Sequence, residues 1–124
     1  MRVLICGSRT FEDSAAIDAV LSGLEWYSPG GPFTVIEGGA KGADAHAGSW
    51  AKTNGVKHEQ YPANWGKHGK AAGPIRNKQM LDEGKPDVVW AFVDKPLAES
   101  RGTHNMVLQA WDLGVPVRVV EVVK

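Results

Sequence analysis

The stretch FTVIEGGAKGADAHAGSWAKT, residues 33–53, decides the fold. Its apolar start over residues 33–37 predicts a buried strand, which Gly38-Gly39 ends. Residues 42–53 then predict a helix, which Asn54-Gly55 stops. A strand that passes through a turn of small residues into a helix is the repeating unit of parallel sheets, so this stretch predicts an α/β fold.

The same alternation continues on both sides of this stretch. Apolar runs predict further strands at residues 3–6, 56–61, 87–93 and 115–122, and the polar character of residues 56–61 favours a position near a sheet edge. Alternating strands and helices predict one domain spanning the whole chain. Its expected fold is a Rossmann-like, doubly wound parallel sheet of about five strands with helices on both faces.

Three more helices and three breaks complete the predicted order. The helices are expected from Asp13 or Ser14 to Tyr27, over residues 75–83 and over residues 103–113. The breaks are a turn over residues 28–32, a long loop rich in Gly, Lys and His over residues 62–74, and a polar loop over residues 94–100. A loop as long as the second one is usually functional in a compact domain.

The composition narrows the class of protein. Lys and Arg total 14 and Asp and Glu total 14, which argues against a dominant electrostatic grip on nucleic acid or on an anionic membrane, although a local basic patch stays open. Cys6 is the one cysteine and lies in an apolar run, so we expect a buried thiol and no internal disulfide. No apolar run is long enough for a membrane helix. We therefore expect a cytoplasmic protein.

The histidines give no indication of a metal site. His46, His58, His68 and His104 lack the spacing of metal ligands, and Cys6 offers them no evident partner. No serine lies in a nucleophile-elbow sequence. We predict neither a metal nor a cofactor.

Unusual residues gather where the predicted strands end, which is where ligands bind in doubly wound sheets. The turns Gly38–Asp44 and Ser100–Thr103 are expected to form one cradle, because main-chain amides of small residues at a helix start can hold an anion. Arg9 and Arg76 would pair with its charge. Asp44 has two open readings, helix-dipole stabilisation and hydrogen bonding to a ribose.

The remaining candidates have similar alternatives. Thr103 could cap its helix or bind phosphate, and Trp65 could stack on a base or anchor its loop. Arg76 and Asp44 are also the candidates for catalysis. The full predicted ligand-binding set is Gly7, Ser8, Arg9, Gly38, Gly39, Ala40, Lys41, Gly42, Asp44, Trp65, Arg76, Asn77, Ser100, Arg101, Gly102 and Thr103.

These residues, in this order, resemble the SLOG superfamily, which includes DprA and the "Lonely Guy" phosphoribohydrolases. The likeness is greatest to its small YspA-type branch, found in bacteria and phages, and covers nearly the whole chain. Its marks are Gly7-Ser8-Arg9, Gly38–Asp44 with Ala47 and Trp50-Ala51, Tyr61–Trp65, Ala72–Asn77 and Arg101-Gly102-Thr103. The resemblance implies a Rossmann-like fold that binds nucleotides or their derivatives.

One departure from the superfamily bears on catalysis. The phosphoribohydrolases carry the motif Pro-Gly-Gly-x-Gly-Thr-x-x-Glu, and its essential glutamate falls here on Met106, after Gly102-Thr103. Methionine cannot exchange a proton or stabilise an oxocarbenium ion. Arg76 does match the superfamily's conserved arginine, so the resemblance implies that binding is kept and acid–base chemistry is lost, unless Asp44 or Glu99 substitutes.

Three functions follow as hypotheses. The first, which we favour, is a binding or sensing module for a nucleotide or a nucleotide-derived ligand. The second is an enzyme that cleaves the N-glycosidic or phosphoribosyl bond of a nucleoside monophosphate. The third is a single-stranded DNA binder, for which the basic and aromatic residues available are Lys41, Lys52, Lys67, Lys70, Arg76 and Trp65.

Five tryptophans are more than the core of so short a chain needs. Trp26, Trp50 and Trp111 all lie on predicted helices, and aromatic residues are enriched at subunit interfaces. We therefore expect a homo-oligomer, with a dimer as the simplest form.

Overall fold

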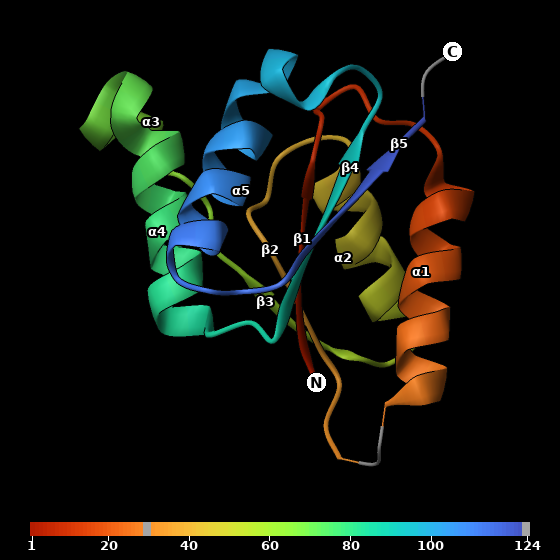
Figure 1. Ribbon diagram of the computed structural model, residues 1–124. Helices are drawn as coiled ribbons and strands as arrows, with labels where there is room; N and C mark the ends of the chain where they lie inside the picture. The colour runs from red at the N-terminus through yellow and green to blue at the C-terminus, as the bar shows by residue number, and fades with distance from the viewer. Residues whose placement is uncertain (29–30, 123–124) are drawn as a thin grey trace.

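The computed structural model describes residues 1–28 and 31–122 and contains one five-stranded sheet (Figure 1). Its strands lie in the order β3-β2-β1-β4-β5, and every neighbouring pair is parallel. The strands are β1 (Arg2–Gly7), β2 (Thr34–Glu37), β3 (Lys57–Gln60), β4 (Val88–Val93) and β5 (Val117–Glu121). The predicted Rossmann-like α/β fold is confirmed, and the polar β3 does lie at an edge.

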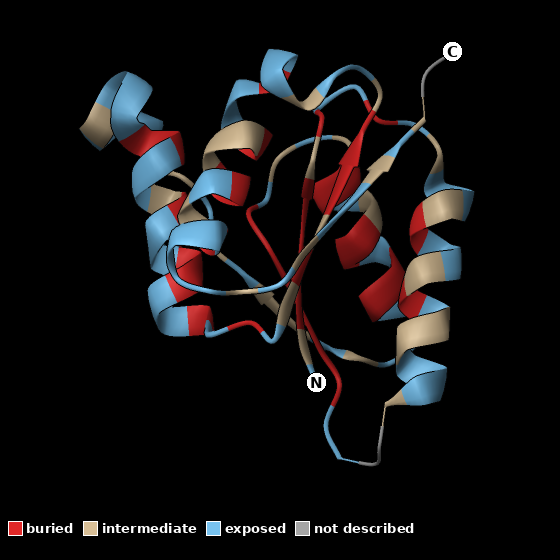
Figure 2. Cartoon of the chain, viewed as in Figure 1, coloured by how far each residue is buried: buried red, intermediate tan, exposed pale blue. Residues whose placement is uncertain are grey.

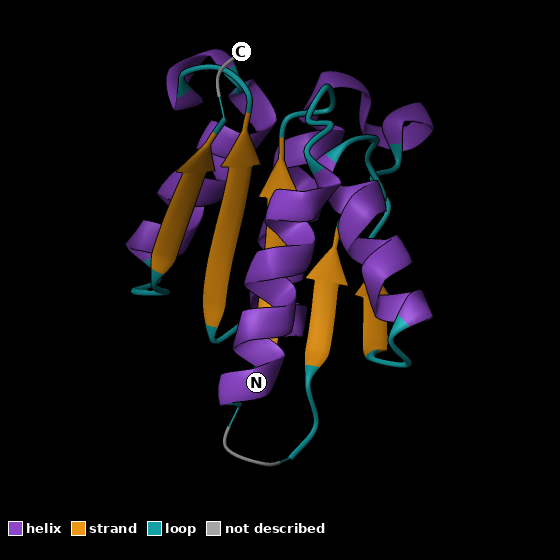
Figure 3. Cartoon of the chain, turned by 90° about the vertical axis from the view of Figure 1, so that its right-hand side faces the viewer, coloured by secondary structure: helices purple, strands orange, loops and turns teal. Residues whose placement is uncertain are grey.

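Helices cover both faces of this sheet (Figures 1 and 3). One face carries α1 (Ser14–Tyr27) and α2 (Ala43–Thr53), and the other carries α4 (Ala72–Gly84) and α5 (Arg101–Asp112). A short helix, α3 (Trp65–His68), and two 3₁₀ turns, η1 (Gly69–Ala71) and η2 (Leu97–Glu99), lie in the connections. Because the strands are parallel, their carboxyl ends all lie at the same end of the sheet (Figure 3).

Alternation along the central strand supplies both cores, which Figure 2 shows as buried segments on either side of the sheet. Val3 and Ile5 of β1 pack under α1 and α2, while Leu4 and Cys6 pack under α4 and α5. Strands buried on both faces give the continuous apolar runs seen in the sequence. Trp50 belongs to this core and packs edge-on against Phe33, with 6.2 Å between ring centroids, so it is not an interface residue.

The prediction of a loop over residues 62–74 is wrong for most of that segment. The Asn64 side chain accepts a hydrogen bond from the Lys67 amide at 3.0 Å and so starts α3. After η1, α4 begins at Ala72 and not at residue 75. Pro74 fits in the first turn of α4, because the amides there have no helical acceptor.

Smaller differences concern the ends of elements. The helix expected to start at Thr103 starts at Arg101, and Thr103 is buried inside its first turn, so Thr103 is not the cap. Residues 94–100 include η2, and the last strand begins at Val117. The predicted break over residues 28–32 includes residues 29 and 30, which lie outside the described residues. Within the described residues, every helix is too short or too polar to cross a bilayer.

Candidate functional site

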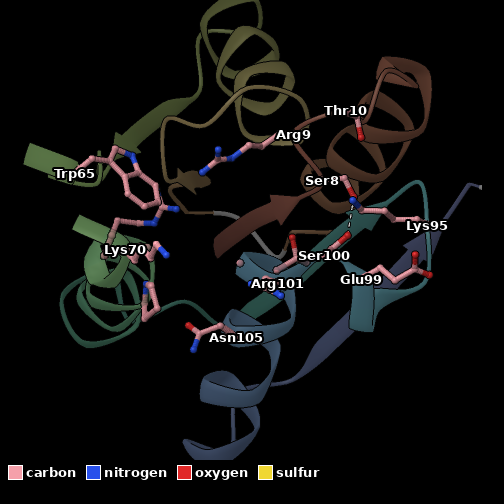
Figure 4. Close-up of a pocket in the computed structure, with 15 residues that line it drawn as sticks. Ser8, Arg9, Thr10, Trp65, Lys70, Lys95, Glu99, Ser100, Arg101 and Asn105 are labelled. Atoms are coloured by element: carbon pink, nitrogen blue, oxygen red, sulfur yellow. Dashed lines mark hydrogen bonds between the residues drawn. The ribbon is translucent and has the colours of Figure 1, made fainter. Parts of the chain in front are cut away.

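A pocket of about 650 Å³ opens at the carboxyl ends of β1 and β4 (Figure 4). From β1 the chain continues to β2 on one side, and β4 pairs with β1 on the other side. The pocket therefore lies at the point where the strand order reverses, which is the usual ligand site of such sheets. It is lined by Ser8, Arg9, Thr10, Trp65, Lys70, Gly73, Pro74, Arg76, Lys95, Glu99, Ser100, Arg101, Gly102, Thr103 and Asn105.

A second hollow, of about 530 Å³, lies beside this pocket along the same edge of the sheet. Both are lined by Arg9, Trp65 and Arg76. The Arg9 guanidinium lies over the Trp65 ring, 5.5 Å from its centroid, in cation–π geometry. Gly38, Gly39, Ala40 and Lys41 line the second hollow and not the first pocket.

The charge of the first pocket differs from that of the whole chain. Its lining holds five cationic side chains, Arg9, Lys70, Arg76, Lys95 and Arg101, against the single carboxylate of Glu99. The chain as a whole has a formal net charge of zero. Such a local surplus of positive charge attracts anions to the pocket.

The amino end of α5 forms one wall of this pocket. Ser100 and Ser8 are both buried, and their hydroxyl oxygens lie 3.1 Å apart (Figure 4). Among the described residues, the amides of Arg101, Gly102 and Thr103 have no hydrogen-bond acceptor. First-turn amides left free in this way, together with the helix dipole, favour an anion.

The turn after β2 has a different arrangement from the one predicted. The amides of Gly38 and Ala40 donate to Oδ2 of Asp44, at 3.0 and 3.4 Å, and the amide of Gly39 donates to Oε1 of Glu37. These three amides are therefore occupied by the protein's own carboxylates. The amides of Gly38, Gly39 and Ala40 are therefore not available for the predicted two-turn amide cradle.

Asp44 is buried, with its side chain directed at the backbone of the turn. Burial, reinforced by the nearby Glu37 carboxylate, raises the pKa of Asp44 to about 7, against the opposing influence of Arg76 and of the two amides. A carboxyl held in this way stabilises the turn. Asp44 lines neither hollow. Its side chain is therefore not placed for the predicted ribose contact or for the candidate catalytic role.

Glu37 extends the same buried polar network toward the sheet edge. Its Oε2 lies 2.7 Å from Nε2 of His58 and accepts a hydrogen bond from Gln60 at 2.9 Å. Sequence reasoning assigned Glu37 to the strand and missed this role. The sequence does carry a signal for this role. Glu37 is an acidic residue at the last position of a strand that is buried on both faces, and a buried carboxylate needs hydrogen-bond partners.

Arg76 is held where the two hollows meet. Its Nη1 donates to the main-chain oxygen of Gly38 at 2.5 Å, and its Nε donates to Oδ1 of Asn77 at 3.0 Å. Asn77 is buried and lines neither hollow. Its amide nitrogen donates to the oxygen of Gly102 and to Asn105, both at 3.1 Å, so Asn77 joins α4 to the start of α5.

Two of the predicted site glycines serve packing. A Cβ on Gly7 would lie 2.1 Å from the main-chain oxygen of Phe92, and a Cβ on Gly42 would lie 2.2 Å from that of Ser8. Gly42 also has a φ of +78°, a backbone conformation that residues other than glycine rarely adopt. Gly7 lets β1 approach β4 closely, and Gly42 lets the start of α2 approach the chain after β1. Neither glycine lines either hollow.

Several lining residues were not predicted as contacts. Thr10 and Lys95 follow the carboxyl ends of β1 and β4, so the strand-end rule applied more widely would have found them. Lys70 lies in the segment predicted as a loop, and η1 brings it to the pocket. Asn105 lies one turn into α5, and no sequence signal marks it. Met106, the residue at the phosphoribohydrolase glutamate position, belongs to α5 and is fully buried in the core between the sheet, α4 and α5.

Comparison with known proteins places this geometry in context. Residues 1–68 match the family described as YAcAr, the YspA, cpYpsA-related SLOG family. The Gene 61 protein of Mycobacterium phage D29 is 40% identical over 121 residues, which cover 94% of this chain and 93% of that protein. The crystal structure of DNA processing protein A (DprA) from Streptococcus pneumoniae superposes with a TM-score of 0.73 at 20% identity. That match covers 95% of this chain and 49% of DprA, so the chain spans about half of DprA and shares its fold.

Proposed function

This chain belongs to the YspA, cpYpsA-related SLOG family, and we propose that it binds an anionic, nucleotide-derived ligand in the pocket between β1 and β4. The observation that carries the proposal is the charge of the pocket, five cationic side chains against one carboxylate in a chain of zero net charge. Arginine suits phosphate because its planar fork donates two parallel hydrogen bonds. Arg9 and the free amides of α5 are the expected phosphate contacts.

The size and remaining lining of the pocket support a nucleotide rather than inorganic phosphate. A volume of about 650 Å³ lies within the range of about 300–1,000 Å³ typical of small-molecule sites. Trp65 is half exposed at the rim and offers a ring face on which a base could stack. Asn105, across the pocket on α5, offers an amide for hydrogen bonds to a base or sugar.

The geometry favours binding over hydrolysis. Met106, at the glutamate position of the phosphoribohydrolases, is in the core, and Asp44 is engaged with the backbone. Among the described lining residues, Glu99 is the one carboxylate available for acid–base work. A single carboxylate with no positioned partner supports binding better than glycosidic cleavage.

The geometry also disfavours a continuous groove for single-stranded DNA. Lys41 and Lys70 do lie near the strand ends, in the second and first hollows. Lys52, by contrast, is in the last turn of α2, which places it toward the amino ends of the strands. Lys52 therefore lies apart from the basic residues at the strand ends.

Thermal unfolding in the presence of nucleoside mono-, di- and triphosphates, sugar nucleotides and ADP-ribose derivatives tests the proposal. A ligand at 100 times its Kd stabilises a protein by about 2.7 kcal/mol, which raises the Tm of a chain of this size by roughly 10 °C. Arg9→Ala should reduce that shift, while Arg118→Ala, on the edge strand β5 and outside the pocket, should not. The absence of a shift with every compound would overturn the proposal.

Two further experiments test the hydrolase and the DNA-binding hypotheses. Release of free base from a nucleoside monophosphate by the wild-type protein, lost in Arg76→Ala, would favour the hydrolase. Binding of a single-stranded oligonucleotide that weakens steeply with salt would favour the DNA binder.

A further inference from the structure

Asn105, on α5, presents only a hydrogen-bond donor to the first pocket. Its Oδ1 accepts two hydrogen bonds, from Nδ2 of Asn77 at 3.1 Å and from Nε2 of Gln109 at 2.8 Å. An amide oxygen has two lone pairs, so both are used inside the fold. Among the described residues, Nδ2 of Asn105 has no acceptor and is not enclosed by the protein. The part of Asn105 that is left for a ligand is therefore the NH₂ group.

The orientation of this amide is fixed by two neighbours that are themselves fixed. Asn77 accepts a hydrogen bond from Nε of Arg76 at 3.0 Å and donates to a main-chain oxygen in the first turn of α5 at 3.1 Å. A guanidinium can only donate and a main-chain oxygen can only accept, so the Asn77 amide cannot turn over. Gln109 is held in the same way, because its Nε2 donates to the main-chain oxygen of Pro74 at 3.2 Å. Both neighbours therefore present donors to Asn105.

Turning the Asn105 amide over would place its NH₂ group against these two donors. Both hydrogen bonds to Oδ1 would be lost, and unpaired donors inside a protein are costly. Asn77 and Gln109 line neither hollow, so they act on the pocket through Asn105 as positioning residues.

Asn105 and the Trp65 ring belong to the same end of the pocket. A Cβ on Gly73 would lie 3.5 Å from Cη2 of the Trp65 ring, so the ring lies beside the first turn of α4. The next residue of that turn, Pro74, accepts the hydrogen bond from Gln109, which also donates to Asn105. A base that stacks on Trp65 in this pocket therefore has Asn105 beside one of its edges.

The charged side chain on this side of the pocket is also a donor. Lys70 lies on the same side as Trp65 and Asn105, and the carboxylate of Glu99 lies on the opposite side (Figure 4). An ammonium group has three donors and no acceptor. A base edge at this end of the pocket thus meets the NH₂ group of Asn105 and a cation, and no carboxylate.

Building on the proposed nucleotide site, we propose that Asn105 determines base specificity and selects a 6-oxopurine, the class of guanine and hypoxanthine, over adenine. The N7 edge of a 6-oxopurine carries two acceptors, O6 and N7, which suit a contact that can only donate. The same edge of adenine carries an acceptor and a donor, and an asparagine binds it with both Oδ1 and Nδ2. Asn105 cannot do so, because its Oδ1 is already engaged.

Inosine monophosphate and adenosine monophosphate test the proposal as a matched pair, because their bases differ in the oxo or amino group at C6 and the N1 proton that accompanies it. Isothermal titration of the whole chain should show inosine monophosphate binding at least about tenfold more tightly. The readout is the ratio of the two dissociation constants. Since both ligands carry the same phosphate, this ratio isolates recognition of the base.

Asn105→Asp reverses the polarity of the contact without removing the internal bonds. One carboxylate oxygen still accepts from Asn77 and Gln109, and the other replaces the pocket-facing donor by an acceptor. The added negative charge weakens binding of both phosphates alike. The preference for inosine monophosphate should therefore disappear or invert.

Gln109→Ala tests the positioning of Asn105 with the pocket lining unchanged. Loss of one of the two donors that hold Oδ1 frees that oxygen to accept from the amino group of adenine. The preference for inosine monophosphate should therefore fall. A merely structural role of Gln109 would weaken both ligands equally and leave the ratio as it is in the wild type.

Asn54→Asp is the control, because it adds the same charge at the end of α2, outside both hollows, and should change neither affinity. Thermal unfolding should show that Asn105→Asp is folded; if it is not, the ratio in Gln109→Ala decides in its place. No binding of any nucleotide would overturn the proposed function and this inference with it. Equal or reversed preference in the wild type, or an unchanged ratio in Asn105→Asp, would overturn this inference alone.

Discussion

Arg76 donates from Nη1 to the main-chain oxygen of Gly38 at 2.5 Å, which fixes the guanidinium at the boundary between the two hollows. The contact requires a glycine, because a Cβ on residue 38 would lie 2.3 Å from Nη1 and 2.7 Å from Cζ of Arg76. The glycine after β2 therefore positions the arginine that follows in α4. Asp44 in turn holds that glycine in place by accepting a hydrogen bond from its amide, and Glu37 accepts one from the amide of Gly39.

Gly38→Ala should displace Arg76 while leaving the fold intact, because the atoms that the new methyl group meets first belong to the end of a flexible side chain. A displaced Arg76 loses its expected charge-assisted hydrogen bond to the ligand. Such a bond is worth about 1.5–3 kcal/mol, so ligand affinity should fall at least about tenfold. Isothermal titration with the ligand identified by thermal shift would measure the loss.

Gly23→Ala is the matched control for that variant, since a Cβ on Gly23 of α1 meets nothing within 4 Å. It should keep full affinity and raise stability by about 0.5–1 kcal/mol, the usual advantage of alanine over glycine in a helix. Equal affinity of Gly38→Ala and wild type would show that Arg76 does not depend on residue 38.

Asp44 should make the protein less stable as the pH rises from about 4 to 7. Its folded-state pKa of about 7 lies above its ordinary value of 3.8, so the folded chain holds the proton more tightly than the unfolded chain does. The stabilisation is complete below 3.8 and is lost as the pH rises through 7. The shift of about three pH units corresponds to about 4 kcal/mol at most.

Asp44→Asn stays neutral throughout this range and keeps an oxygen for the Gly38 amide. Its stability relative to wild type should therefore improve from pH 4 to pH 8, as urea unfolding at several pH values would show. Parallel curves for the two proteins would mean that another group controls the pH dependence.

The fold was predictable because its signals are local. β1 and β4 lie inside the sheet and must be apolar on both faces, so their sequences appear as unbroken apolar runs. The connection before α4 was not predictable in the same way. Its glycines and lysines suggest a loop, and only the Asn64 cap and the tolerance of Pro74 in a first turn allow helix there.

The site was predictable to the extent that it follows from strand ends. Ser8, Arg9 and Ser100 line the pocket because they follow β1 and precede α5. The acceptor of the amides after β2 was not predictable. Small residues before a helix start can donate either to a bound anion or to the protein's own Asp44, so the sequence is the same in both cases. Only the position of the Asp44 side chain in the folded chain distinguishes the two.

Gly7→Ala should destabilise the protein strongly. The added Cβ would meet the main-chain oxygen of Phe92 at 2.1 Å and the Cβ of Ala43 at 2.7 Å, and neither atom can move without shifting β4 or α2. Overpacking of this kind costs about 1–3 kcal/mol, and backbone contacts favour the upper end. Urea unfolding would measure it beside Gly102→Ala, whose Cβ meets nothing within 4 Å and should not reduce stability.

Trp65 should report ligand binding by its fluorescence. It is 49% exposed and is the one tryptophan among the described lining residues of the two hollows, where Arg9 lies over its ring. Trp50 and Trp90 pack with the core under α1 and α2, and Trp26 is exposed at the end of α1. Trp111 is exposed on α5 and lines neither hollow. A ligand that displaces Arg9 or stacks on the ring changes the surroundings of Trp65 and leaves those of the other four tryptophans as they are. Trp65→Phe should therefore abolish the change in emission on ligand addition and retain most of the affinity, because phenylalanine still offers a ring face.

Trp26→Phe is the control and should leave the change in emission in place. An undiminished signal in Trp65→Phe would place the ligand elsewhere.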